Sequence, residues 1–233
     1  MNKDLTQSPP REFKYLQLLS MLYITMLLAS VITTMYLVEI LGFTFNMGAA
    51  VIPCMYFLGD IIAEVYGYKY SRNLIWYALL CDIVFISIAV ATVHLPTPAY
   101  WHQQTEFQTV LGNLDRLIVS GIIAFPASEF INVYILSKFK ILLKGSYFWI
   151  RSFTSSLIGE FSLALLGSII IFYNTLSMRQ IFFLALSSFA IKLCFSFFAV
   201  VPATLLQKWL KRVEKTDVDD SNTNFNPFKL ALS

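Results

Sequence analysis

Four ionisable side chains lie well inside long apolar stretches of this sequence: Asp82, Glu129, Glu160 and Lys192. An ionisable group facing lipid near the middle of a bilayer costs about 3 kcal/mol, so such groups normally face the interior of a helix bundle and mark function. Setting Lys192 against Glu129 and Glu160 leaves one surplus negative charge. We therefore expect a cationic ligand or a proton to supply the balance.

Small and polar residues accompany these charges at helical spacing. Asn132 lies about one turn from Glu129, and Ser156 lies about one turn from Glu160. Such stripes let helices approach closely and can line a wet cavity. The pattern predicts a polar cavity between the helices; the alternative is a charge-compensated cluster that only holds three helices together. The candidate substrate-binding residues are Glu129, Asn132, Glu160, Lys192 and Ser156.

A second acidic pair lies near the end of another apolar run. Asp60 and Glu64 are four residues apart, which on a helix places both carboxyl groups on one face. Acidic groups near the C-terminal end of a helix oppose its dipole, so a cation should lie nearby. Lys69 and Arg72 are the nearest in sequence. The pair is interpreted either as a helix clamp at the membrane edge or as a direct contact to substrate.

The composition indicates a membrane protein, because only 13% of the 233 residues are charged and 57% are hydrophobic. Soluble domains carry about 25% charged residues. Six apolar runs are long enough to cross a bilayer. The sequence therefore predicts an all-α polytopic membrane domain over residues 16–206, between an N-terminal tail (1–15) and a disordered C-terminal tail (207–233). The six predicted spans are about 16–38, 47–65, 74–93, 114–137, 147–173 and 181–206.

Basic residues concentrate on one side of the predicted membrane domain. Fourteen lysines and arginines fall in the two tails and in the loops after the second and fourth spans, whereas Arg116 and Arg179 alone fall on the other side. Cytoplasmic loops carry the excess of Lys and Arg. We therefore expect both termini in the cytoplasm and the long connection of residues 94–113 outside.

Enzyme and metal signatures are sparse. The sequence holds no HExxH, GxSxG or P-loop motif. Its three cysteines lie in apolar runs without CxxC spacing, and its two histidines lie in a loop without neighbouring acids. No basic patch interleaved with aromatic residues suggests a nucleic-acid partner. We expect no catalytic residue, metal or cofactor; an intramembrane hydrolase using Asp60 and Asp82 is kept as an alternative from another class.

Several short motifs along most of the chain resemble one known family, the queuosine-precursor transporters, also called the vitamin uptake transporter family. The most specific block is centred on Gly59-Asp60 and Glu64. The motifs that carry the resemblance are Gly59-Asp60, Glu64, Tyr66-Gly67 and Arg72; Leu95-Pro96 and Trp101; Arg116 and Ser120; Arg151 and Ser155-Ser156; and Lys192, ten residues before Pro202.

The resemblance implies a six-helix protein of the bacterial inner (plasma) membrane, similar to the substrate-binding subunits of energy-coupling-factor vitamin importers. It also implies import of a 7-deazaguanine precursor of the tRNA base queuosine: preQ0, preQ1 or queuine. Among the matched motif residues, Asp60, Glu64, Arg72, Arg116 and Arg151 are interpreted as a structural clamp. No cofactor is expected; the partners are the small base and the lipid bilayer, with a homo-oligomer or an energising partner left open.

Two departures from the family pattern bear on the choice of substrate. The family tends to carry aspartates where this chain has Asn132 and Leu163, while Glu129 and Glu160 each lie three residues earlier. The negative charge is therefore displaced by about one turn. We hypothesise that the glutamates meet a cationic amine, as on preQ1 or queuine. A subunit that binds ligand but needs an energising partner complex remains the main alternative to a complete transporter.

Overall fold

The computed structural model describes residues 13–34, 36–40, 43–98, 100–173, 176–221 and 223–229. Each predicted apolar run forms a helix that is long and apolar enough to cross a membrane, six in all among the described residues. The polytopic helical architecture predicted from the sequence is thus confirmed. The six helices are α1 (Leu16–Thr33), α2 (Gly48–Tyr66), α3 (Tyr68–Val93), α5 (Asp115–Leu142), α6 (Phe148–Phe172) and α7 (Met178–Glu214).

The first span is shorter than predicted, and two short paired strands follow it. Helix α1 ends at Thr33, and the strands β1 (Leu37–Ile40) and β2 (Phe43–Asn46) pair antiparallel, with Leu37 opposite Asn46. Strand β1 contains Val38 and Ile40, and β2 contains Phe43, Thr44 and Phe45; these residue types favour extended structure. In the long connection expected outside the membrane, residues Gln104–Leu111 form the short helix α4.

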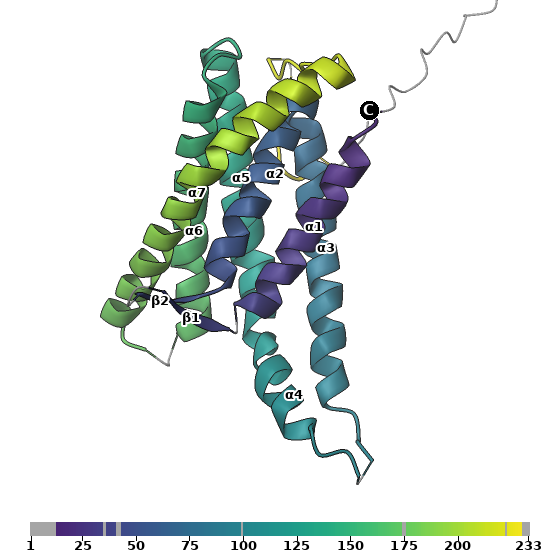
Figure 1. Ribbon diagram of the computed structural model, residues 1–233, viewed down its shortest axis with the longest axis vertical. Coiled ribbons are helices and arrows are strands. Elements are labelled where there is room, and N and C mark those ends of the chain that lie inside the picture. The colour runs from purple at the N-terminus through teal and green to yellow at the C-terminus, as the bar shows by residue number, and fades with distance from the viewer. Residues whose placement is uncertain are drawn as a thin grey trace, which may run out of the picture.

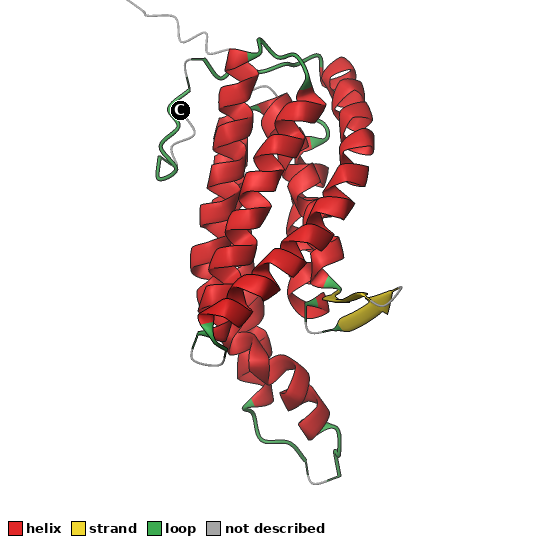
Figure 2. Ribbon diagram, turned by 90° about the vertical axis from the view of Figure 1, so that its left-hand side faces the viewer, coloured by secondary structure: helices red, strands yellow, loops and turns green. Residues whose placement is uncertain are grey.

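Helix α2 is the centre of the bundle. Fourteen of its nineteen residues are buried, and it contacts α1, α3, α5, α6 and α7. Figures 1 and 2 show the long helices running side by side around it, with α4 beyond one end of the bundle. A helix that is enclosed on nearly all sides can present a carboxyl group only to its neighbours, not to lipid.

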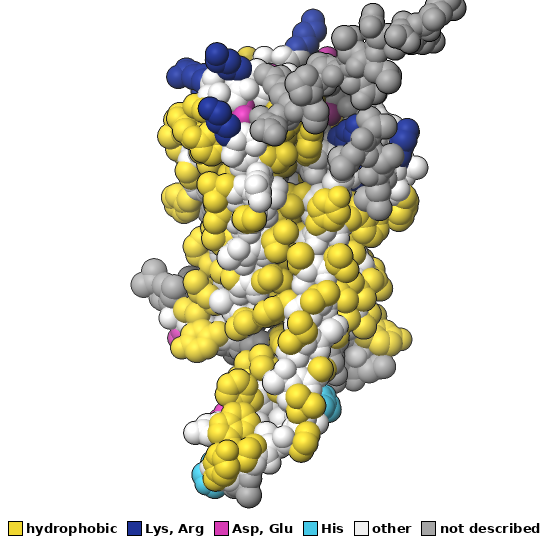
Figure 3. Space-filling model, turned by 90° about the vertical axis from the view of Figure 1, so that its right-hand side faces the viewer, with side chains coloured by type: hydrophobic (Ala, Val, Ile, Leu, Met, Phe, Trp, Pro, Cys, Tyr) yellow, Lys and Arg dark blue, Asp and Glu magenta, His cyan; other side chains and the backbone are white. Residues whose placement is uncertain are grey.

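The molecular surface has the bands expected of a membrane protein. Figure 3 shows hydrophobic side chains along the middle of the molecule, Lys and Arg side chains gathered at one end, and His side chains at the other. Many large apolar side chains on the long helices are exposed, including Phe197 and Phe198 of α7. In water such a surface would promote aggregation, whereas in lipid it is the normal exterior.

Helix α7 extends beyond its predicted end at residue 206. It begins with a capping box, in which the backbone N–H of Ser177 donates to Gln180 Oε1 at 2.9 Å. It has 37 residues and is therefore about 55 Å long, more than the hydrocarbon thickness of a bilayer. Its last turns consequently lie beyond the apolar band, where Glu214 accepts a hydrogen bond from the backbone N–H of Tyr15 at 2.8 Å.

The chain after α7 is packed against the bundle, in place of the disordered tail expected from its composition. Asp220 accepts a hydrogen bond from the backbone N–H of Tyr68 at 3.1 Å. The guanidinium of Arg72 donates to the carbonyl of Asn224 at 3.2 Å, and Trp76 Nε1 donates to that of Pro227 at 2.8 Å. We call residues 215–221 and 223–229 the C-terminal strap. It is held by individual hydrogen bonds, which composition alone does not reveal.

Phe225 is the main apolar anchor of the strap. Its ring lies 4.8 Å from that of Tyr68 and 5.6 Å from that of Tyr134, and the Lys138 ammonium lies 4.2 Å from its centroid. Aromatic and cation–π contacts of this kind contribute about 1 kcal/mol each. We expect Phe225→Ala to raise the rate of tryptic cleavage at Lys215 roughly tenfold by favouring local opening.

The matched control for this change is Phe228→Ala, because Phe228 is 74% exposed and, among the described residues, its ring contacts that of Trp76 alone, at 5.8 Å. Its cleavage rate should stay within about threefold of the wild-type rate. Equal cleavage rates in the two variants would show that Phe225 does not anchor the strap.

Candidate functional site

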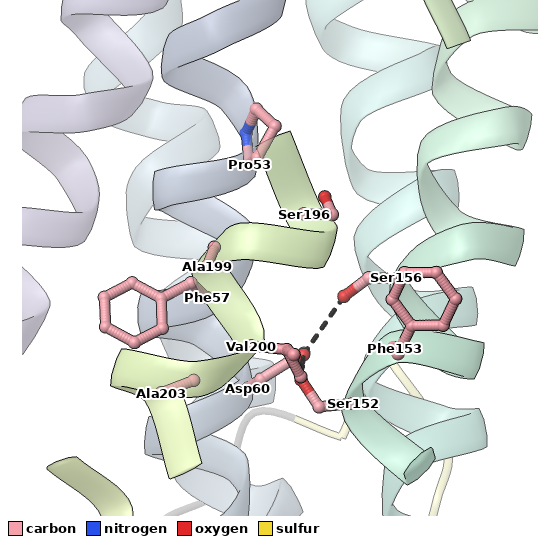
Figure 4. A pocket seen from close by; sticks show the side chains of 10 residues that line it. All are labelled: Pro53, Phe57, Asp60, Ser152, Phe153, Ser156, Ser196, Ala199, Val200 and Ala203. Atoms are coloured by element: carbon pink, nitrogen blue, oxygen red, sulfur yellow. Dashed lines mark hydrogen bonds between the residues drawn. The ribbon is translucent and has the colours of Figure 1, made fainter. Parts of the chain in front are cut away.

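Asp60 lies in the middle of the bundle and is bonded by neutral donors from two other helices. Asn132 Nδ2 of α5 donates to Asp60 Oδ1 at 2.8 Å, and Ser156 Oγ of α6 donates to Oδ2 at 3.0 Å. Ser152 Oγ donates to the same oxygen. Figure 4 shows the two serines of α6 directed at the Asp60 carboxyl group. Asp60 is fully buried, and no cation bonds it among the described residues.

Glu64, one turn further along α2, is surrounded by cations instead. Arg151 of α6 binds it with both terminal nitrogens, Nη1 to Oε2 at 2.8 Å and Nη2 to Oε1 at 3.1 Å. Lys211 Nζ of α7 lies 2.6 Å from Oε1. Both members of the Arg151–Glu64 pair are about 99% buried or more. A two-pronged, buried ion pair of this type fixes the relative orientation of the elements that carry it.

Two further groups extend this ion-pair cluster to the strap. Lys140 Nζ of α5 donates to the backbone carbonyl of Glu64 at 2.6 Å and to that of Val218 at 2.7 Å. Asp217 lies 2.9 Å from both Lys140 Nζ and Lys211 Nζ. Partial burial would raise the pKa of Asp217, but hydrogen bonds from the two lysines hold it below the usual value of 3.8. The strap is therefore part of the charge balance around Glu64.

The cations that bond Glu64 are not the ones nearest in sequence. Lys69 and Arg72 were expected there, but Arg72 donates to strap carbonyls and Arg151 and Lys211 bond the glutamate. The chain reverses at Gly67, which has φ +89°, so Arg72 belongs to the next helix and faces the strap. The side chain of Arg116, also assigned to the clamp from the sequence, lies outside the described residues.

Glu160 and Lys192 form a second buried polar group, between α6 and α7. Ser196 Oγ donates to Glu160 Oε1 at 2.5 Å, and Lys192 interacts electrostatically with the same carboxyl group. Glu160 Oε2 has no hydrogen-bond partner among the described residues. Glu160 is fully buried and Lys192 is 6% exposed. One acceptor atom of this pair is thus available to another donor.

Glu129 lies between α1, α2 and α5 without a bonded cation. It is fully buried, and the Tyr23 hydroxyl lies within hydrogen-bonding reach of its carboxyl group, which leaves at least one carboxyl oxygen without a partner among the described residues. The buried hydroxyl of Tyr56 lies near Ser128, and both tyrosines interact electrostatically with Glu129. Its electrostatic neighbours also include Asp60 and Glu160. Buried polar atoms without partners are uncommon and usually indicate a site that binds water, an ion or a ligand.

Asp82 is buried elsewhere. It is 3% exposed on α3 and faces Gly121 of α5, where an added Cβ would meet Asp82 Oδ2 at 2.7 Å. Of the four intramembrane charges singled out in the sequence, Glu129 and Glu160 therefore lie near Asp60, and Lys192 lies beside Glu160. Asp82 does not line the cavity beside Asp60.

The cavity beside Asp60 is small in this structure. Its volume is about 10 Å³, room for roughly one water molecule. Figure 4 shows its lining side chains, which come from α2, α6 and α7. Of the candidate binding residues, only Ser156 lines the cavity. Glu160 is hydrogen-bonded to Ser196, which lines it. The lining residues are Pro53, Phe57, Asp60, Ser152, Phe153, Ser156, Ser196, Ala199, Val200 and Ala203.

Ser152 and Ser196 are functional candidates that the sequence reasoning did not select. Both belong to the small and polar stripes of α6 and α7, one or two turns from the charges. The stripes were the available signal, but they contain several serines each. Only the hydrogen bonds of Ser152 to Asp60 and of Ser196 to Glu160 distinguish these two from the others.

Gly159 lets α6 approach α2 and α5 closely behind this site. A Cβ at this position would lie 2.9 Å from Asn132 Cβ, 3.0 Å from Tyr56 Cε1 and 3.1 Å from the carbonyl oxygen of Ser128. We expect Gly159→Ala to destabilise the protein by about 1–3 kcal/mol, because the extra methyl overpacks the interface. Thermal unfolding of both proteins in detergent would measure this loss of stability.

Gly112→Ala is the matched control, because no atom of the described residues lies within 4 Å of a Cβ added there. Its unfolding free energy should stay within about 0.5 kcal/mol of the wild-type value. If the Gly159→Ala protein is as stable as the control, the helices accommodate the extra methyl group without a loss of stability.

The six apolar helices and the charged groups buried among them define a multi-pass helical membrane protein with a polar interior. Residues 46–207 match the family described as "Putative vitamin uptake transporter". The chain belongs to this vitamin uptake transporter family, as the motif resemblance predicted. The family assignment favours a transporter over an enzyme.

One curated relative supports the same assignment. The chain is 25% identical over 126 residues to a "Probable queuosine precursor transporter" of Bacillus subtilis (strain 168). The match covers 53% of this chain and 54% of the relative, so the chain spans about half the length of that protein. No solved structure matches the chain.

Proposed function

We propose that this protein imports a 7-deazaguanine precursor of queuosine (preQ0, preQ1 or queuine) across the bacterial inner membrane, for salvage into tRNA. The name of the Bacillus relative supports the substrate class. The observation that carries the proposal is the buried polar group of Asp60, Glu129 and Glu160, which lies between apolar helices and has unpartnered acceptor atoms. Unpartnered acceptors suit a small heterocycle rich in N–H donors.

The proposed binding residues are the five candidates from the sequence. All five are buried, with at most 6% of any of them exposed, and Ser156 lines the cavity itself. The two glutamates outnumber Lys192, which suits a ligand that brings a positive charge, as the amines of preQ1 and queuine do. The proposed set is Glu129, Asn132, Glu160, Lys192 and Ser156.

Binding a bicyclic base requires the cavity to widen, because its present volume admits roughly one water molecule. The lining residues come from α2, α6 and α7, so separation of α6 and α7 from α2 would open it. The ion-pair cluster around Glu64 joins the same three helices beside the strap. We propose that this cluster, with Asp60 one turn away, clamps one end of the pathway.

The proposed orientation places both termini in the cytoplasm. Lys and Arg side chains gather at the end of the molecule that carries the strap, whereas the α4 end carries the His side chains (Figures 1 and 3). The excess of basic residues on the cytoplasmic side of membrane proteins supports this choice. We further propose that the six-helix arrangement resembles the substrate-binding subunits of energy-coupling-factor importers.

The second candidate function is a ligand-binding subunit that needs an energising partner complex. A six-helix arrangement like that of the energy-coupling-factor subunits is compatible with this function. The intramembrane hydrolase receives no support, since Asp82 does not line the cavity that Asp60 lines.

Proteoliposomes containing this chain alone separate the two remaining candidates. With labelled preQ1 outside, a complete transporter should give uptake that saturates with concentration and is competed by unlabelled preQ1. Saturable binding without entry into the lumen would favour the partner-dependent subunit. If the protein neither binds nor takes up preQ0, preQ1 or queuine, that result would contradict the proposed function.

A further inference from the structure

The two acidic residues of α2 have different surroundings. Glu64 is neutralised by the two-pronged pair with Arg151 and by Lys211. Asp60, one turn away on the same helix, is bonded only by Asn132, Ser152 and Ser156 among the described residues. Cations fix Glu64 as a structural group, whereas Asp60 has donors but no opposite charge.

Neutral donors do not offset the burial of a carboxyl group as a cation does. Hydrogen bonds from hydroxyls and an amide satisfy its oxygens, but the charge itself stays uncompensated in an apolar medium. The serine hydroxyls can rotate about their Cα–Cβ bonds and give up the carboxyl group to another donor. Asp60 also lines the cavity, so a ligand there could reach its oxygens directly. These features are expected of a binding residue whose present hydrogen-bond donors can be replaced by the donors of a ligand.

We propose that Asp60 binds the edge of the ligand that carries two adjacent N–H donors, and so selects guanine-type rings. In a 7-deazaguanine this edge consists of the ring N–H and the neighbouring exocyclic amine. Two parallel N–H groups match the two oxygens of a carboxyl group, as in an arginine–carboxylate pair. The inference rests on the proposed function and assigns to Asp60 a role beyond the helix clamp.

The rest of the cavity suits a flat ring held at this edge. Phe57 and Phe153 also line the cavity, and Figure 4 draws them on either side of Asp60. Proteins that recognise single bases commonly stack them on aromatic side chains and read the base edge by hydrogen bonds. Ser196 lines the cavity too and donates to Glu160. A ring bonded to Asp60 would therefore have a second polar group within the same cavity for its remaining substituents.

The test compares two competitors that differ by one amine. Purified protein in lipid nanodiscs binds tritiated preQ0, and unlabelled 7-deazaguanine or 7-deazahypoxanthine displaces it. 7-Deazahypoxanthine has the same ring but lacks the exocyclic amine. The wild-type protein should bind 7-deazaguanine at least roughly tenfold more tightly, because the analogue leaves one oxygen of Asp60 without its ligand donor.

Asp60→Asn should remove this preference, bringing the two competitors within about threefold of each other, because the amide replaces one acceptor by a donor. Asp82→Asn is the matched control: it makes the same change in a buried aspartate that does not line the cavity, and it should keep the wild-type preference. If Asp60→Asn does not fold, Asp60→Glu serves, since a displaced carboxyl group should weaken binding of 7-deazaguanine more than that of the analogue.

Each outcome separates this inference from the proposed function. Equal displacement by both competitors in the wild-type protein, or an undiminished preference in the Asp60 variant, would overturn the role of Asp60 and leave the transporter proposal standing. Failure of wild-type protein to bind preQ0, preQ1 and 7-deazaguanine would overturn both.

Discussion

Replacing Arg151 by methionine should lower the free energy of unfolding by about 3 kcal/mol. The substitution removes the two-pronged partner of Glu64, which is 99% buried, and leaves Lys211 as its bonded cation. Breaking a buried ion pair costs about 3–5 kcal/mol when the remaining charge has no partner, so the low end of that range is expected here. Arg151 Nε also donates to the backbone carbonyl of Ser146 at 2.8 Å, so the start of α6 loses a second contact. Unfolding in mixed micelles with increasing denaturing detergent would measure the loss.

Arg179→Met is the matched control, because Arg179 is exposed at the opposite end of the bundle, near the start of α7. It should change stability by no more than about 0.5 kcal/mol. Combining Glu64→Gln with Arg151→Met should recover part of the loss, since the buried carboxylate that lost its two-pronged partner is then neutral and Lys211 keeps Asp217. A single Arg151→Met protein with wild-type stability would show that Glu64 is held by other groups.

Glu129→Gln and Glu160→Gln together should reduce import of preQ1 at least tenfold while leaving preQ0 import within about threefold of wild type. The amine of preQ1 is a cation and the nitrile of preQ0 is neutral, so only preQ1 loses the attraction of two buried carboxyl groups. Both glutamates have acceptor atoms without partners among the described residues. Competition between the two labelled precursors in the same cells would measure the ratio directly.

Glu106→Gln is the control for this pair, because Glu106 is exposed on the short helix α4. It should alter neither precursor's import. Unchanged preQ1 import in the variant that carries both glutamine substitutions would contradict the hypothesis that these glutamates meet the amine.

The sequence predicted the membrane helices well, because their signal is local. Each span is a run of apolar residues, and nothing outside the run is needed to recognise it. The burial of Glu129, Glu160 and Lys192 followed in the same way from the cost of exposing a charge to lipid. The structure places all three in the interior, with at most 6% exposed. Their role in binding stays a prediction.

The partners of the buried charges were not predictable in this way. Glu64 is paired with Arg151, 87 residues away, and with Lys211, 147 residues away. The sequence offered Lys69 and Arg72, which are close along the chain but follow the reversal at Gly67. Which cation reaches a carboxyl group depends on how helices pack, and a single sequence does not contain that information.

The C-terminal strap was unpredictable for a related reason. Its composition is polar, with few apolar residues, and such segments usually remain disordered. Its order depends on contacts to side chains of other elements, such as those from Arg72, Trp76 and Lys140 to strap carbonyls. Backbone carbonyls accept these bonds, so the strap's own residue types give little indication of them.

The proposed import of queuosine precursors is tested most directly by the queuosine content of tRNA. The tRNA comes from a bacterial strain that can neither synthesise nor import these precursors, carrying this gene and fed preQ0, preQ1 or queuine in turn. We expect queuosine in the tRNA with preQ1, and none when the gene is omitted. Queuosine-free tRNA under all three feeding conditions, with the protein present in the membrane and a known importer restoring the modification, would contradict the proposed import.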